Sequence, residues 1–297
     1  MPAVLNTNTA SLYASKNLQS AQNRMATSVE RLSSGLRINR AKDDAAGLGI
    51  AQSLTSQINS ANQGIRNLNE GISMVQAAEG AISAAVEMGQ RILTLATQGA
   101  NGSQGQAGRD AIKSEMQQLL IAITAISSRT NYSGVSLLNE STGTASATLI
   151  TLQTSNGSSD KITLSNDAFR KIGAGDVAKI TTASNDASGQ ASALSNQVFT
   201  TATQANMLST ISVANDYITA LTTQRSLLGA YQNQIEFTIN NVTELSSNLN
   251  AARSSVQDTD YATETAALTK GQILQQAATA MLAQANQMPN VILSLLK

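Results

Sequence analysis

Histidine, cysteine and tryptophan are all absent from this 297-residue chain. Without His or Cys, the chain has no imidazole base, no thiolate nucleophile and no zinc site of the His/Cys type, and it cannot form a Ser-His-Asp triad. Lys, Asp, Glu and Tyr remain as side chains that could carry out catalysis. The absences favour a protein that is not an enzyme, and we predict no cofactor and no metal.

Aromatic residues and proline are scarce: Phe, Trp and Tyr make up 3% of the chain, and Pro occurs 2 times. The hydrophobic fraction of 41% is carried mostly by Ala, Leu, Ile and Val. These side chains suit narrow seams between helices better than a thick core built around buried rings. The composition therefore argues against a conventional large globular core.

Net charge and long apolar runs are also missing. The 19 basic residues balance 19 acidic residues, so no overall field attracts nucleic acid or an anionic membrane. No segment approaches the roughly 20 apolar residues that span a bilayer, and the N-terminus lacks the basic start and apolar run of a secretory signal peptide. We expect no membrane insertion, and any export would use a route without a cleaved signal.

Two long segments carry apolar residues at heptad spacing, which predicts two long helices packed through narrow seams. The first seam contains Leu54, Ile58, Ala61, Ile65, Leu68, Ile72, Val75, Glu79, Ile82, Val86, Gly89, Leu93 and Ala96. The second contains Met207, Ile211, Ala214, Ile218, Leu221, Arg225, Leu228, Gln232, Ile235, Ile239, Val242, Ser246 and Leu249. A third, shorter helix is predicted to start at Asp110, after a Gly-rich turn.

Four glycines, Gly64, Gly71, Gly80 and Gly89, lie inside the first long helix. Each costs on the order of 1 kcal/mol relative to Ala in a helix interior. Either an exposed position tolerates this cost, or another segment comes too close for a side chain. The sequence leaves both explanations open.

The two ends of the chain carry weaker apolar stripes, which we assign to assembly. The residues assigned to assembly are the large apolar ones, Leu18, Met25, Val29, Leu32 and Leu36 at one end and Leu274, Met281, Met288, Ile292 and Leu295 at the other. Gln22, Ala278 and Ala285 complete the same spacing. Such narrow stripes do not stabilise an isolated helix in water. We therefore expect the two ends to pack against each other and against neighbouring copies of the chain, as in a polymer subunit.

The middle of the chain, residues 131–204, changes character. The segments TLITLQTS (148–155) and DKITLSN (160–166) alternate apolar and polar residues around a turn, which predicts a β-hairpin. The segment DASGQASALSNQ that follows has no strong period and is interpreted as a connector. We expect this polar region to lie on the solvent-facing side of the molecule.

A dense group of charges, Arg31, Arg37, Arg40, Asp43 and Asp44, stands out between residues 28 and 54. Adjacent carboxylates do not face each other across a substrate, which argues against a catalytic pair. A solvated charged surface is one explanation. We favour a joint in which Asp43 or Asp44 caps a helix that begins near residue 45, while the basic residues stay extended and available to a neighbour.

Several segments resemble bacterial flagellins. SVERLSSGLRINRAKDDAAGLGIA is similar to the N-terminal signature of that family, and QRILTLATQGANGS is similar to the stretch that follows it. Near the other end, RSLLGAYQNQIEFTINNV and the last 40 residues resemble the C-terminal signatures. The resemblance covers nearly all of residues 1–140 and 205–297, and the motifs occur in the expected order.

The resemblance implies a structural subunit of the extracellular flagellar filament used for bacterial motility. The implied fold is mainly α, a long antiparallel coiled-coil-like helical bundle with a small β-hairpin region. Residues 1–44 and 256–297 would form terminal helices that pair into an inner coiled coil in the filament. Residues 45–130 and 205–255 would form the long-helix core, and residues 131–204 a hairpin and connector without a large outer domain.

The resemblance also implies partners. The chain would polymerise with itself, bind a flagellar export chaperone through its C-terminal segment, and meet hook-associated and cap proteins in the flagellum. A host innate receptor detects members of this family, and the matching surface maps to Arg91, Leu95 and Glu115. Two alternatives stay open: a hook–filament junction protein, and a cell-surface flagellin homologue that binds polysaccharide.

Overall fold

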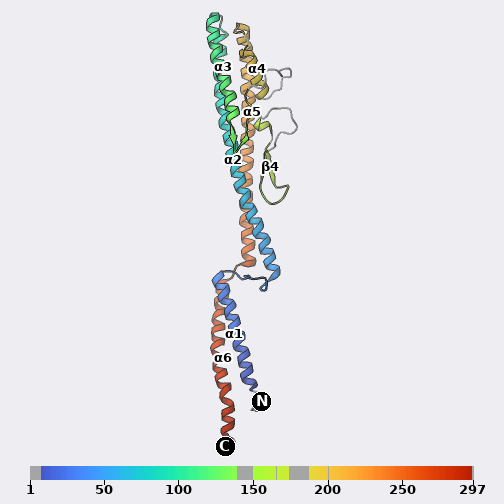
Figure 1. Cartoon of the computed structure of the whole chain (residues 1–297), viewed down its shortest axis with the longest axis vertical. Helices are drawn as coiled ribbons and strands as arrows, with labels where there is room; N and C mark the ends of the chain where they lie inside the picture. The colour runs from blue at the N-terminus through green and yellow to red at the C-terminus, as the bar shows by residue number, and fades with distance from the viewer. Residues whose placement is uncertain (1–7, 139–149, 165, 174–186, 200, 296–297) are drawn as a thin grey trace. The chain divides into compact units, whose positions relative to one another are not determined.

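Helices dominate the computed structural model, which describes residues 8–138, 150–164, 166–173, 187–199 and 201–295 (Figure 1). The helices are α1 (Thr9–Ser34), α2 (Ala45–Gly99), α3 (Gln106–Arg129), α4 (Ala187–Phe199), α5 (Gln204–Gln257) and α6 (Tyr261–Leu295). The antiparallel strand pairs are β1 (Asn131–Tyr132) with β2 (Val135–Ser136) and β3 (Ile150–Gln153) with β4 (Lys161–Leu164). The prediction of a mainly α bundle with a small β region is confirmed.

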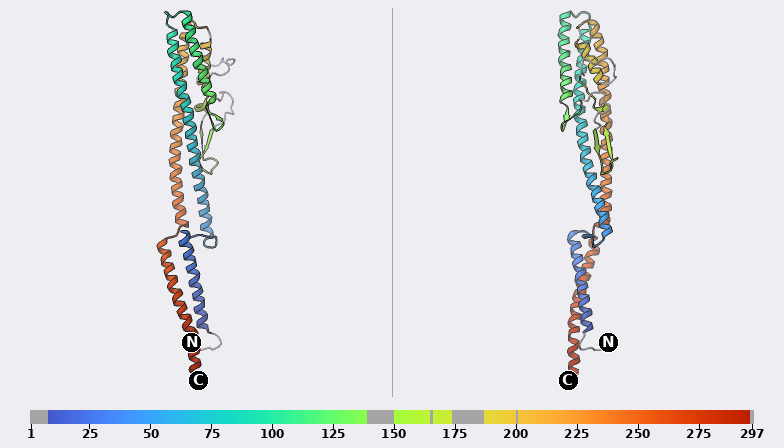
Figure 2. Two further views of the ribbon diagram at one scale, coloured as in Figure 1. Left: turned by 60° about the vertical axis from the view of Figure 1, so that its left-hand side comes forward. Right: turned by 45° about the vertical axis from the view of Figure 1, so that its right-hand side comes forward.

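Two compact units make up the chain: residues 1–58 with 247–297, and residues 59–246. The first unit is built around α1 and α6, which lie side by side in every view (Figures 1 and 2). These two helices are antiparallel, because Asn8, just before α1, reaches Ala285 near the far end of α6, while Arg31 near the end of α1 meets Glu264.

The second unit contains α3, α4, the strands and the greater parts of α2 and α5. Within it, α2 and α5 pack antiparallel: Gly99 lies against Met207, and Ser246 donates a hydrogen bond to Asn62. The two charged residues in the predicted heptad series, Glu79 and Arg225, form an ion pair of 3.1 Å between these helices. The acidic residue in the α2 series therefore pairs with the basic residue in the α5 series.

The buried face of α2 differs in part from the predicted seam. One predicted row is buried, formed by Ala61, Leu68, Val75, Ile82, Gly89 and Ala96. The other predicted row is half-buried from Ile65 onward, and the buried row lies one residue earlier, at Gly64, Gly71, Ala78, Ala85, Ile92 and Gly99. The reason is that α2 packs against the hairpin and α3 as well as against α5, so its buried face is wider than a two-helix seam.

Close approach of other segments explains three of the four α2 glycines that the sequence left unexplained. A Cβ at Gly64 would lie 1.8 Å from the carbonyl oxygen of Thr154, and one at Gly71 would lie 2.2 Å from the Leu152 side chain. A Cβ at Gly89 would lie 3.3 Å from Ile218 on α5. A Cβ at Gly80 would have no atom of another segment within 4 Å. Gly80 is therefore explained by an exposed position that tolerates glycine.

The predicted hairpin is confirmed, with Ile150 paired to Leu164 and Gln153 paired to Lys161. The expectation that this region faces solvent is wrong for a large part of it. The described residues of the middle region that are fully buried in the core include Leu137, Leu138, Leu164, Ala168, Phe169 and Ile172. The strands and the turns around them therefore complete the core of the second unit.

Two buried side chains of α5 hold residues 168–172 in place. The hydroxyl of Tyr217 donates a hydrogen bond of 2.9 Å to the carbonyl of Ile172, and burial raises the pKa of this phenol. The amide of Gln224 donates to the carbonyls of Ala168 and Arg170. The long helix thus supplies hydrogen-bond donors to the backbone carbonyls of this segment.

Two further elements differ from the prediction. The segment interpreted as a connector contains α4, whose Ala191, Leu194, Ser195 and Val198 are buried at helical spacing. Its small and polar residues carry too weak a hydropathy pattern to predict a helix. Helix α3 begins at Gln106 rather than at Asp110, because Gly105 takes the extended N-cap conformation.

Candidate assembly interface and joint

Small residues at heptad spacing form the seam between α1 and α6. On α1 they are Ala14, Ala21 and Ser28, and on α6 they are Gly271 and Ala285, all buried, with the half-buried Ala278 between them. A Cβ at Gly271 would lie 3.5 Å from the Cβ of Met25. The helices therefore approach closely through positions that carry little side chain.

The residues that the sequence assigns to assembly lie beside this seam. Leu18, Met25 and Leu32 are half-buried at its edge. Leu36 lies beyond the end of α1, in an isolated bridge with Asp258.

The remaining assembly residues are exposed or outside the described side chains. Val29 is 50% exposed, Leu274 is 41% exposed and Met281 is 64% exposed. Met288, Ile292 and Leu295 belong to the last turns of α6, where the side chains lie outside the described residues. Large apolar side chains are thus left uncovered within a single copy.

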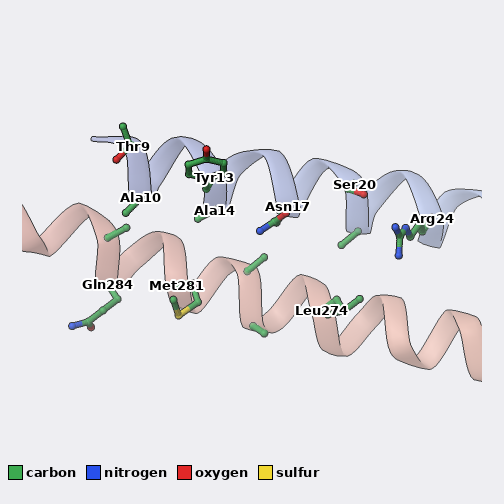
Figure 3. A pocket seen from close by; sticks show the side chains of 14 residues that line it. Thr9, Ala10, Tyr13, Ala14, Asn17, Ser20, Arg24, Leu274, Met281 and Gln284 are labelled. Atoms are coloured by element: carbon green, nitrogen blue, oxygen red, sulfur yellow. The ribbon is translucent and has the colours of Figure 1, made fainter. Parts of the chain in front are cut away.

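A groove of about 740 Å³ runs between α1 and α6 (Figure 3). Tyr13 and Ala10 line it from α1, and Leu274, Ala277 and Met281 line it from α6. Tyr13, like Met281, is mostly exposed. The groove is therefore an apolar surface that this unit does not fill with its own side chains.

The two adjacent aspartates of the joint accept hydrogen bonds from different parts of the backbone. A carboxylate oxygen of Asp44 accepts the backbone N–H of Gly47 at 2.9 Å, which is the predicted cap of α2. Asp43 instead accepts the N–H of Arg40 at 2.9 Å and that of Asn39 at 3.2 Å. The hydrogen bond from Arg40 is the main reason that the pKa of Asp43 is lowered. One carboxylate starts the helix and the other closes the preceding turn.

Replacing Asp44 with Ala is expected to loosen the first turn of α2. Loss of an N-cap costs about 1 kcal/mol, so the amide of Gly47 should exchange with solvent about 5-fold faster. Native-state hydrogen exchange followed by NMR measures this rate. Asp110→Ala, which removes an exposed aspartate from α3, is the matched control; equal acceleration at Gly47 in both variants would contradict the cap.

The basic residues of the joint have partners within the chain, contrary to the expectation that they stay free for a neighbour. Arg37 donates its backbone N–H to the carbonyl of Gln257 at 2.7 Å and its guanidinium to the carbonyl of Val256 at 2.6 Å. Arg40 forms an exposed ion pair of 2.7 Å with Glu30.

Arg31 is 3.5 Å from Glu264 on α6. Glu264, which is 8% exposed, was not predicted from the sequence as part of the joint. Asp260, which accepts the N–H of Ala262 and caps α6, was not predicted either. A Thr and a Glu three and four positions after Asp260 resemble a helix start, and this was the available signal.

The proposed receptor residues do not form one surface. Arg91 on α2 and Glu115 on α3 are exposed and form an ion pair of 2.7 Å. Leu95 is 2% exposed and belongs to the core. Of these three residues, only Arg91 and Glu115 are exposed.

Within the described ranges, no group of three or more Asp or Glu side chains is placed to hold a metal ion. The described helices also lack any stretch long and apolar enough to cross a membrane.

Comparisons with known proteins match both ends of the chain. A sequence profile of the bacterial flagellin N-terminal helical region matches residues 5–142, and one of the C-terminal helical region matches residues 211–296. The flagellin of Halalkalibacterium halodurans is 37% identical over 294 residues, which are 99% of this chain and 100% of that one. Flagellin B of Vibrio cholerae is 32% identical over 371 alignment positions, covering 98% of this chain and 99% of that one.

A similar fold occurs in the solved structure of a proposed flagellar hook-associated protein from Vibrio parahaemolyticus. It has a TM-score of 0.53 and 14% sequence identity, and the match covers 73% of this chain and 100% of that one. This likeness concerns the fold alone.

Proposed function

The chain belongs to the bacterial flagellin family, whose members are structural subunits of the flagellar filament, and we propose that its terminal helices are the elements that join neighbouring subunits. The observation that carries this proposal is the apolar surface left open on α1 and α6 within one copy: Tyr13, Val29, Leu274 and Met281 are all exposed. Large exposed apolar surfaces mark interaction sites. A second copy of the same chain is the partner that a filament supplies.

The proposal divides the chain by task. Residues 1–44 and 256–297 act as the polymerising segments, and residues 45–130 and 205–255 act as the supporting core. Residues 131–204 contribute the hairpin and α4 to that core instead of forming a large outer domain. The alignment with flagellin B spans more positions than this chain has residues, so that relative contains residues that this chain lacks. This supports the absence of a large outer domain here.

We also propose a route to the filament. The subunit leaves the cell without a cleaved signal, through the flagellar export channel, and a chaperone holds residues 256–297 beforehand. The exposed Ile273, Leu274 and Met281 of α6 support this step, because such side chains favour aggregation until they are covered. Hook-associated and cap proteins then meet the same terminal segments at the filament ends.

Recognition by a host innate receptor is proposed only for the exposed Arg91 and Glu115 pair. Leu95 supports that surface from the core, where it packs within the second unit.

Polymerisation of the full chain and of a chain lacking residues 1–44 and 256–297 tests the assignment. Both are given sheared filament seeds or a precipitating salt and are viewed by negative-stain electron microscopy. We expect filaments from the full chain and none from the truncated chain, whose helix content by circular dichroism shows whether its core remains folded. Filaments from the truncated chain would overturn the terminal assignment. A full chain that stays monomeric under every condition would favour the junction or polysaccharide-binding alternative.

A further inference from the structure

The seam between α1 and α6 does not define its own register. Met25 lies against Gly271, and counting from this contact along antiparallel helices places Leu18 opposite Ala278 and Ala14 opposite Leu282. Each of these layers pairs one large side chain with one small one. All the residues involved are buried or half-buried, as packed layers require.

A shift by seven residues keeps the same complementarity. It would place Met25 opposite Ala278, Leu18 opposite Ala285 and Leu32 opposite Gly271, so that each large residue again meets a small one. Heptad repeats allow such slippage unless polar groups specify one register. The apolar seam alone therefore discriminates poorly between the two arrangements.

Polar contacts at the joint do discriminate. The backbone N–H of Arg37 donates to Gln257, and the N–H of Thr259 donates to Gly35 at 2.9 Å, which closes the bridge between Leu36 and Asp258. The Arg37 guanidinium adds its bond to Val256. Gly35 has a φ of 73°, a conformation that Gly adopts freely and that turns the chain out of α1 toward this bridge.

The ion pair between Arg31 and Glu264 strengthens this selection. The carboxylate is almost fully buried, so it needs its partner. A heptad shift would move Glu264 about 10 Å along α1, out of reach of Arg31. A buried charge that loses its partner is strongly unfavourable.

We propose that the joint, rather than the apolar seam, sets the register of the α1–α6 pair, with Arg31 and Arg37 as its positioning residues. These charged residues of the joint thereby fix the position of α1 along α6. The effect of the register on assembly rests on the proposed function, because a shifted helix pair would present its groove to the next subunit at a different position. The register itself is a property of the single chain.

Disulfide trapping in the full chain tests which register the two helices adopt. The chain contains no Cys of its own, so an introduced pair of cysteines can react only with each other within one chain. Met25→Cys with Gly271→Cys reports the observed register, since the separation of 3.5 Å between the Cβ positions suits a disulfide. Met25→Cys with Ala278→Cys and Leu18→Cys with Gly271→Cys report shifts in the two directions. Intramolecular oxidation rates are read on non-reducing gels, both for unpolymerised chain and for pelleted filaments.

In the unchanged background we expect the first pair to oxidise at least about 10-fold faster than either shifted pair, a preference of about 1.4 kcal/mol. Arg31→Ala combined with Arg37→Ala should raise the rate of a shifted pair about 5-fold or more, because the lost charge partner no longer disfavours the shift. Glu264→Gln, which keeps the shape and removes the charge, should act in the same direction with a smaller effect. Arg40→Ala is the matched control, since it removes one Arg of the same joint whose ion pair lies within the N-terminal segment.

Equal oxidation of native and shifted pairs in the unchanged background would overturn the proposal. A second outcome would also overturn it: neither the double variant nor Glu264→Gln raises the oxidation rates of the shifted pairs, whether those rates stay unchanged or fall together with the rate of the native pair. The register is measured in the unpolymerised chain as well, so this test does not depend on polymerisation. Whether the terminal helices drive polymerisation is decided separately by the truncation experiment.

Discussion

Replacing Met281 with Glu is expected to abolish polymerisation while leaving the helix content of the subunit unchanged. The side chain is 64% exposed in the groove between α1 and α6, so the substitution removes little packing within one copy. In a filament the same position would be covered by a neighbour, and an unpaired buried carboxylate costs about 3–5 kcal/mol. The critical concentration for assembly should rise at least about 100-fold, as follows from about 3 kcal/mol per contact. Sedimentation of polymer from a concentration series measures it.

Gln276→Glu provides the control for added charge on α6. Gln276 is exposed on the same helix but does not line the groove, and we expect a change in critical concentration of less than about 5-fold, because an exposed charge contributes little. Comparable losses in both variants would mean that net charge rather than the groove controls assembly. Assembly of Met281→Glu at the parent concentration would show that the groove is not a contact.

The heptad spacing of α2 and α5 was enough to predict two long paired helices, because Leu, Ile and Val recur on one stripe over many turns. The hairpin was also predictable, since β3 and β4 alternate apolar and polar residues around a turn. The second buried row of α2 was not. Gly64 and Gly71 are buried by the hairpin, a contact made by residues far away in sequence, and Gly contributes nothing to a hydropathy pattern.

In the terminal helices, too, buried small residues were difficult to predict from the hydropathy pattern. The large residues assigned to assembly on α6, Leu274 and Met281, are exposed within one copy. The seam uses instead Gly271, which the predicted stripe lacked, and Ala285, which the stripe contained without being assigned to assembly. Small residues give a weak periodic signal, yet they let two helices approach closely. The large residues lie beside the seam, which is the arrangement expected of a helix pair with additional surfaces to cover.

The joint was predictable in outline and not in detail. Two adjacent aspartates before a helical pattern indicate a cap, and Asp44 provides it. The partners of Arg37 could not be predicted, because it bonds to the backbone carbonyls of Val256 and Gln257, and every residue carries such a carbonyl. Glu264 is the single acidic residue in the sequence of α6, and its burial depends on how α1 and α6 pack.

Replacing Gly64 with Ala should lower the free energy of unfolding of the second unit by about 1–2 kcal/mol, the upper part of what overpacking costs once the helix-propensity gain is subtracted. The added methyl would lie 1.8 Å from the carbonyl oxygen of Thr154 and 2.5 Å from its carbonyl carbon. That backbone cannot yield easily, since Thr154 bonds to Asp160 through both its N–H and its hydroxyl, and Asn67 holds the carbonyl of Gln153. Overpacking of this kind costs about 1–3 kcal/mol and occasionally more, against a gain of about 1 kcal/mol from the better helix propensity of Ala.

Gly80→Ala makes the same chemical change on the same helix and should have the opposite sign. No atom lies within 4 Å of the position that its Cβ would occupy, so only the helix-propensity gain of up to about 1 kcal/mol remains. Urea denaturation followed by circular dichroism compares the two variants, and hydrogen exchange at Thr154 shows whether the hairpin has lifted from α2. Equal stabilisation by both substitutions would mean that the hairpin does not rest on Gly64. A loss confined to Gly64→Ala would show that this glycine is required for the close contact with the strand.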